Sequence, residues 1–208
     1  MQTYKIIITK ELIHEYHLCY MQQNPKCKTL PFAKSETIKL FNKDGTPQLT
    51  AGGKQKTKKK AINKKNYTID DCMYGCLSLN DLLVIQNRMV MNNKKASWGL
   101  LGEWIADKYN LSNLQITNCL MEYRVFSETK AKKDNDNIAA GIKLLNDGLL
   151  VKSGMCKDDN YFIVNPLLIN CDYSKEMPRT EIRITTFPDG LKDVYEKMRI
   201  HAENFKEF

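Results

Sequence analysis

Two groups of acidic residues lie on either side of residues 138–157 and are the side chains best suited to chemistry. The first belongs to the segment K-A-K-K-D-N-D-N, in which Asp134 and Asp136 lie two residues apart. The second is Asp158 and Asp159, directly before an expected strand. In extended backbone, side chains two residues apart point to the same side, so these carboxylates are able to converge at one edge of a sheet. Mg²⁺ prefers such oxygen ligands. The pattern therefore predicts a site for Mg²⁺, with Mn²⁺ as a substitute, at Asp134, Asp136 and Asp159, with Asp158 beside it.

Lysines surround the first acidic group, at positions 130, 132 and 133. Such lysines oppose the binding of a cation alone, but they suit a phosphodiester substrate that must approach carboxylates. A metal ion held there lowers the pKa of a bound water and stabilises charge on the scissile phosphate. A calcium-binding EF-hand is excluded because Ala139 stands where that loop requires glycine. The arrangement therefore favours a nuclease, with Lys130, Lys132 and Lys133 on backbone phosphates.

The same acidic residues also have a purely structural interpretation. Asp136 is a good helix N-cap, Asp134 is a good turn residue, and Asp158 and Asp159 suit an ordinary turn before a strand. Residue types alone leave both interpretations open.

The elements that position these residues follow from hydrophobic periodicity. Alternating or β-rich runs predict four strands, at Tyr4–Thr9, Gln115–Phe126, Tyr161–Ile169 and Arg179–Thr186. A polar stretch, Asp172–Pro178, separates the last two strands and predicts that they pair antiparallel. An amphipathic helix is expected from Asn137 to about Val151, because its apolar residues recur at i, i+4, i+7 and i+11.

Further helices are expected between the first and second predicted strands and after the last one. Ser78 begins a predicted helix that ends at a break over Asn92–Lys95, and Ser97 caps a second helix. A last helix covers residues 189–208. The order predicts an α/β or α+β fold, in which helices pack on a small mixed sheet within one domain of residues 1–208.

Residues 42–67 differ in composition from the rest of the chain. They are rich in glycine and lysine and nearly free of large apolar residues, which predicts an exposed, flexible insertion. Two interpretations stay open, a basic arm that binds DNA phosphates and a solvated loop. The candidate DNA-binding lysines of this insertion are Lys54, Lys56, Lys58, Lys59, Lys60, Lys64 and Lys65.

Composition narrows the classes of protein. The 208 residues include 32 Lys and Arg against 24 Asp and Glu, a net charge of +8 that favours a polyanionic partner without choosing one. No apolar run is long enough to cross a bilayer. Seven cysteines without a secretion signal predict a reducing, cytoplasmic location. Zinc remains an alternative use of the cysteine and histidine pairs, namely Cys19 and Cys27, Cys72 and Cys76, and His14 and His17.

The ordered set K-K-D-N-D-N, amphipathic helix, D-D and strand resembles the RusA family of Holliday-junction resolvases and related phage endonucleases. Asp134, Asp136 and Asn137 match the family's first motif, and Asp158 and Asp159 match its last. Between them, Lys143 and the step Asp147-Gly148-Leu149 match the helix of the family. The likeness covers residues 115–187 well and the N-terminal half poorly.

Three departures qualify this resemblance, one of which is a slightly longer stretch at Val151–Lys157. The family lysine lies one helical turn after the second aspartate, where this chain has Ala140, so Lys143 takes that role only with an insertion of about three residues. The insertion at 42–67 also has no counterpart in compact members of the family.

The resemblance implies a homodimeric, metal-dependent endonuclease that resolves Holliday junctions or related branched double-stranded DNA. Asp134, Asp136 and Asp159 hold the metal in this interpretation, and Lys143 stabilises the transition state. A non-catalytic DNA-binding protein of the same fold is the alternative, and a zinc-stabilised interaction module is a third.

Overall fold

The computed structural model describes residues 2–27, 30–33, 35–61, 67–72, 88–128, 135–160 and 162–187. At residues 35, 36, 59, 61 and 135–137 the description extends to the backbone alone. The chain forms two compact units, one of residues 1–9 and 75–208 and the other of residues 10–74. The predicted C-terminal helix at 189–208 and the helix expected from Ser78 up to residue 87 lie outside the described residues.

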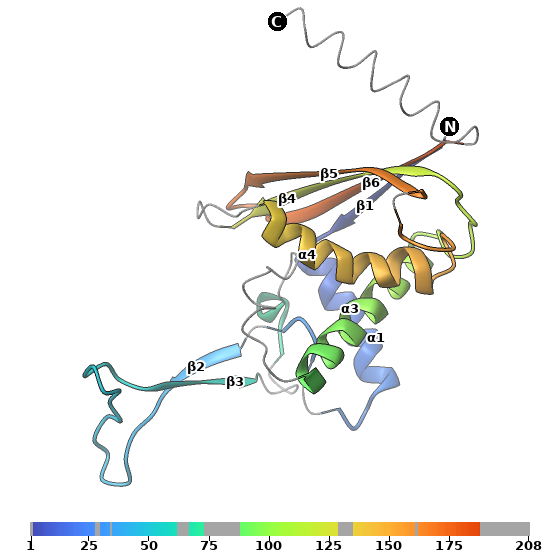
Figure 1. Ribbon diagram of the computed structural model, residues 1–208. Coiled ribbons are helices and arrows are strands. Elements are labelled where there is room, and N and C mark those ends of the chain that lie inside the picture. Colours follow the sequence, from blue (N-terminus) through green and yellow to red (C-terminus); the bar gives the residue numbers. More distant parts are fainter. Residues whose placement is uncertain are drawn as a thin grey trace, which may run out of the picture. The chain divides into compact units, whose positions relative to one another are not determined.

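A four-stranded mixed sheet is the centre of the first unit (Figure 1). Its strands are β1 (Gln2–Ile8), β4 (Cys119–Ser127), β5 (Val164–Tyr173) and β6 (Arg179–Thr186), in the order β1-β6-β4-β5. β6 runs antiparallel to both β1 and β4, whereas β4 and β5 are parallel. The prediction of a small mixed sheet with helices packed on it is confirmed, and so are the four predicted strands, with bounds that differ by a few residues.

The predicted pairing of the last two strands is wrong, because β4 lies between β5 and β6. β4 alternates buried side chains at Met121, Tyr123 and Val125, and an apolar strand of this kind is most stable with a neighbour on each side. The chain that leaves β5 passes the end of β4, where the Ser174 amide donates to the carbonyl of Ser127 over 2.9 Å. A polar connection between two strands therefore did not indicate a hairpin here.

A second correction concerns α3 (Arg88–Lys108), which is continuous through the break predicted at Asn92–Lys95. Ser97 does not cap a new helix; its hydroxyl donates back to the Asn93 carbonyl over 2.9 Å, inside the helix. A stripe of buried residues that includes Trp98, Leu101 and Ile105 stabilises the helix. Packing of this stripe outweighs the weak local preference of the polar residues for a turn.

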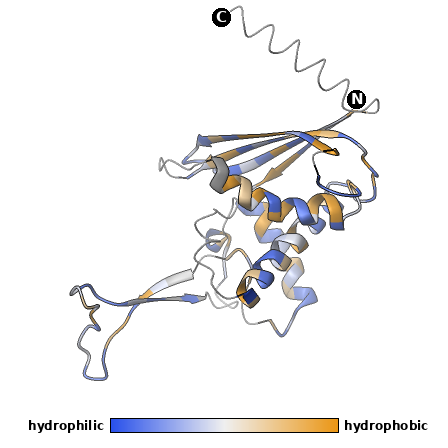
Figure 2. Ribbon diagram, viewed as in Figure 1, coloured by the Kyte–Doolittle hydropathy of each residue, from blue (hydrophilic) through white to orange (hydrophobic). Residues whose placement is uncertain are grey.

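Helices α3 and α4 (Asn135–Asn146) lie on one face of the sheet (Figure 1). The chain continues from α4 directly into a π-helical segment, η3 (Asp147–Lys152). Apolar and polar residues alternate in the strands, and apolar residues are frequent along α4 and η3 (Figure 2). The Tyr123 hydroxyl donates to the side-chain oxygen of Asn146, both buried, and so joins β4 to the end of α4.

The second unit contains α1 (Lys10–Gln23), an antiparallel hairpin of β2 (Ser35–Lys39) and β3 (Thr57–Ala61), and a short 3-10 helix, η2 (Ile69–Asp71). Buried residues of α1 include Leu12, Ile13 and Tyr16. None of the helices in the described part of the chain is long and apolar enough to cross a membrane.

Candidate metal and phosphodiester site

Lys143 joins helix α4 to the acidic loop that precedes β5. Its ammonium lies 3.0 Å from Asp159 Oδ2 and 3.5 Å from Asp147 Oδ1. Asp147 is four residues further along the helical path, so that pair is local, whereas Asp159 comes from a separate segment. The hydrogen bond that Lys143 donates to Asp159 is the main cause that raises the pKa of Lys143, and the carboxylate of Asp147 adds to it. The structure therefore places two of the predicted site residues, Lys143 and Asp159, in direct contact.

Asp158 and Asp159 have different surroundings although they are adjacent. Asp158 is exposed, and its two carboxylate oxygens accept from the Asp159 amide and from the Asn160 side chain, each over 2.8 Å. Asn160 in turn accepts from the amide of Phe162 over 3.0 Å. Asp158 thus organises the turn, and the Asp159 side chain, 17% exposed, is the one aimed at Lys143.

The first acidic group is described only in part. Asp136 lies in the first turn of α4, and its side chain is outside the description, as are Asp134 and the neighbouring Lys130, Lys132 and Lys133. Lys143 follows Asp136 by seven residues, which is nearly two turns and roughly 10 Å along the axis. Among the described residues, no three side chains of His, Cys, Asp or Glu lie close enough together to hold a metal ion. If Mg²⁺ binds here, Asp159 would supply one of the hard oxygens that it requires, and Asp134 and Asp136 would have to complete the set.

The described lysines of the basic insertion lie on the β2–β3 hairpin. Lys54, Lys56, Lys58 and Lys60 are exposed. Lys59 belongs to β3, but its side chain is not described, and Lys64 and Lys65 lie outside the described residues. The hairpin is thus a basic arm with regular strands at its base, because β2 pairs with β3 in register from Ser35–Ala61 to Lys39–Thr57.

Of the two histidines that were candidate zinc ligands, His14 and His17, the second is occupied by hydrogen bonds. His17 is fully buried; its Nε2 donates to the Pro31 carbonyl, and its Nδ1 accepts from the hydroxyl of Tyr67. The Tyr67 oxygen lies 2.7 Å from Cys72 Sγ, and His14 stacks on the Tyr67 ring. Burial lowers the pKa of His17 to about 4 and keeps the ring neutral. This network uses both ring nitrogens of His17, so it leaves neither of them for a metal.

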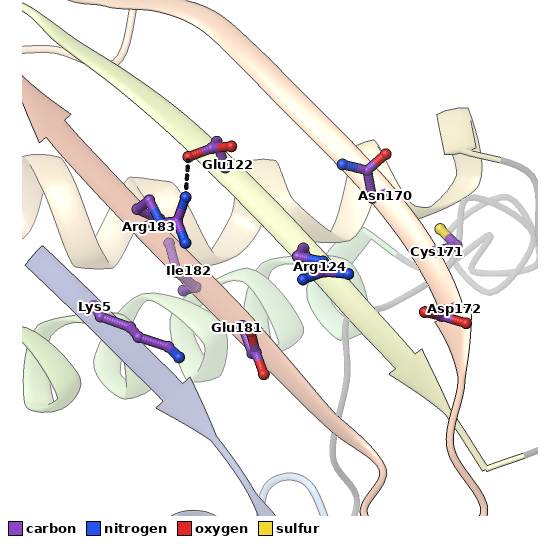
Figure 3. Close-up of a pocket in the computed structure, with 9 residues that line it drawn as sticks. All are labelled: Lys5, Glu122, Arg124, Asn170, Cys171, Asp172, Glu181, Ile182 and Arg183. Carbon is purple, nitrogen blue, oxygen red and sulfur yellow. Dashed lines mark hydrogen bonds and ion pairs between the residues drawn. The ribbon is translucent and has the colours of Figure 1, made fainter. Parts of the chain in front are cut away.

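Sequence reasoning missed a cavity on the sheet face opposite to α3 and α4 (Figure 3). This cavity, of about 520 Å³, is bordered by three basic and three acidic side chains, Lys5, Arg124, Arg183, Glu122, Asp172 and Glu181. These charged residues alternate with buried residues along the strands, and this alternation was the sequence signal for the cavity. The charges of the two central strands alternate: Glu122 is opposite Arg183, at 3.4 Å, and Arg124 is opposite Glu181 in the register. Balanced charge of this kind does not favour a polyanion, so this face is a poor candidate for DNA.

Comparison of the chain with protein-family models and with curated proteins finds no match.

Proposed function

We propose that this chain is a Mg²⁺-dependent endonuclease of the RusA type that cuts Holliday junctions or related branched DNA. The observation that carries the proposal is the 3.0 Å contact between Lys143 and Asp159. The contact joins two parts of the sequence motif that are distant in the chain, namely the helix lysine and the second aspartate pair. A single site that binds a phosphodiester requires these two parts to lie together. The mixed sheet with helices on one face is compatible with that fold.

In this proposal the acidic residues hold the cation and the lysines hold the substrate. Asp159 would be a ligand together with Asp134 and Asp136, and Asp158 would keep the loop in shape through its bonds to the Asp159 amide and to Asn160. When bound, the cation polarises the attacking water and neutralises charge on the scissile phosphate. The Lys143 ammonium would move from Asp159 onto a non-bridging phosphate oxygen, where it stabilises the negative charge that grows in the transition state.

Two further parts of the proposal concern the partners of the chain. Lys130, Lys132 and Lys133 would bind backbone phosphates next to the cut. A homodimer would supply two sites related by a two-fold axis, as a four-way junction with paired cuts requires.

One observation favours the non-catalytic alternative, a DNA-binding protein that keeps the fold. Ala140 stands at the position of the family lysine, and Lys143 is already engaged by Asp147 and Asp159. A lysine held by two carboxylates neutralises part of the site instead of serving a substrate.

Cleavage of a synthetic four-way junction in Mg²⁺ distinguishes the two. We expect symmetrical cuts by the wild type, loss of cutting in Asp159→Asn and Asp136→Asn, and retained junction binding in both variants. Asp147→Asn is the matched control, since it removes a carboxylate beside Lys143 that is not a proposed ligand. Junction binding without cutting by the wild type, in both Mg²⁺ and Mn²⁺, would establish the non-catalytic function instead.

A further inference from the structure

The outer end of the β2–β3 hairpin, residues 40–56, has a defined structure that we call the hairpin head. Three backbone segments meet in it through a closed ring of hydrogen bonds. The Leu40 amide donates to the Lys56 carbonyl, the Lys56 amide to the Gln48 carbonyl, and the Gln48 amide to the Leu40 carbonyl, over 2.9, 2.6 and 2.9 Å. The head is therefore held together by hydrogen bonds of its own backbone.

Two turns of equal length project from this ring, at residues 42–46 and 50–54 (Figure 1). Each closes with the same pair of backbone hydrogen bonds, and each has a glycine with positive φ at its fourth position, Gly45 at 83° and Gly53 at 74°. This is the three-residue hairpin loop in which glycine takes the left-handed position. The two turns are thus related by a spacing of eight residues.

The eight-residue spacing also relates the two large apolar side chains of the head that are exposed. Phe41 and Leu49 each follow a residue of the ring, and they are 52% and 54% exposed. A single exposed apolar residue is ordinary, but two at equivalent positions of a built framework indicate a surface for a partner.

Exposed lysines accompany these side chains along the whole hairpin, namely Lys39, Lys43, Lys54, Lys56, Lys58 and Lys60. Residues 35–61 contain seven lysines against two acidic residues, Glu36 and Asp44. The Asp44 carboxylate is engaged within the first turn, since it accepts from the Thr46 amide and hydroxyl. The partner should therefore combine negative charge with a flat apolar surface.

We infer that Phe41 and Leu49 form an apolar wedge that packs on the base pair exposed at a DNA branch, while the hairpin lysines bind the flanking phosphates. A side chain that enters a linear duplex must first unstack a base step, which costs free energy, whereas a branch leaves one face of a base pair open. Phosphate contacts by lysine cannot tell a branch from a duplex. The wedge would thus supply selectivity for branches, and this inference rests on DNA being the substrate of the proposed function.

The test compares binding of the full-length chain to a four-way junction and to a linear duplex of the same sequence, in EDTA so that no cutting occurs. Stacking on one base changes affinity by about ten- to a hundredfold. We expect Phe41→Ala with Leu49→Ala to weaken junction binding by at least tenfold and duplex binding by less than twofold. Phe41→Trp should keep junction binding. Leu100→Ala with Met177→Ala, which removes two exposed apolar side chains of the other unit, is the matched control and should change neither.

A 2-aminopurine base at the branch reports the contact directly. Because stacking quenches this base, its fluorescence should fall when the wild type binds and should stay unchanged with the double variant. Equal weakening of junction and duplex, or no weakening at all, overturns the wedge. The wedge is also overturned if the double variant loses binding to anionic lipid vesicles but keeps binding to the junction. Because no step requires cutting, a chain that binds branches through the wedge without cleaving them would refute the nuclease and leave this inference standing.

Discussion

The ammonium of Lys143 lies 3.0 Å from the carboxylate of Asp159, sixteen residues later in the chain. The contact fixes the acidic loop before β5 against helix α4. The lysine side chain is 65% exposed, so the pair contributes little to stability by itself. Its main importance is placement, because it puts a cationic group where a phosphate would meet the proposed metal ligands.

Replacement of Lys143 by methionine should lower the rate of junction cutting by about 10²–10³-fold, the range for loss of one group that stabilises transition-state charge. Single-turnover cleavage with excess enzyme measures this rate separately from binding. Lys175→Met, which removes an exposed lysine in another loop, should leave the rate unchanged. Equal rates for Lys143→Met and the wild type would remove Lys143 from the mechanism.

Gly148 lies where η3 meets α3, and a Cβ there would collide with the backbone of Gly99. Gly148→Ala should therefore destabilise the protein by about 3 kcal/mol, at the upper end of the range for overpacking, because backbone cannot yield as a side chain does. Urea unfolding gives the free energy directly. Gly99→Ala is the matched control, since its new methyl group would meet the flexible end of Lys152 and should cost much less.

Gly148 also separates what the sequence could predict from what required the structure. The family likeness assigned the step Asp147-Gly148-Leu149 to the helix, and the structure adds the reason for its small residue. Strand Arg179–Thr186 was predicted with its observed bounds because its alternation is regular. The contact between Lys143 and Asp159 was not predicted, since nothing in the spacing says which carboxylate a long side chain will reach.

The errors came from features that depend on distant residues. The pairing of β5 and β6 looked local, but the competing neighbour, β4, lies far away in the sequence. The paired turns of the hairpin head were also missed, because Phe41 and Leu49 share no residue type and only their backbone positions are equivalent. Glycine at positions 45 and 53 was the available signal.

Stability should fall between pH 6.5 and pH 4 because of His17. Burial lowers the pKa of this imidazole to about 4 in the folded chain, while its ordinary value is 6.5. The unfolded chain therefore binds more protons in this window, so stability is complete above pH 6.5 and decreases as the pH falls. Each unit of separation between the two pKa values is worth about 1.4 kcal/mol.

Thermal unfolding across this pH range tests the prediction. His17→Gln should flatten the dependence, although it will lower stability at every pH through loss of the hydrogen bonds to Pro31 and Tyr67. His14→Gln should keep the larger part of it, because the buried network of His17 remains. A wild-type profile that is flat between pH 4 and pH 6.5 would contradict a neutral, buried His17.

The lysines of β3 should control affinity for DNA more than the rate of cutting. Lys58 and Lys60 are exposed on the basic arm, and each phosphate contact that is lost lowers the salt dependence of log K by about 0.9. We expect Lys58→Ala with Lys60→Ala to weaken junction and duplex binding alike and to reduce the salt slope, while bound enzyme cuts at the wild-type rate. Titrations between 50 and 200 mM salt, roughly the range over which such effects are large, measure this slope.

The control for this prediction is Lys95→Ala with Lys175→Ala, which removes the same charge from exposed positions of the other unit. If that control reduces the slope equally, the effect belongs to net charge and the hairpin is not the DNA-binding arm.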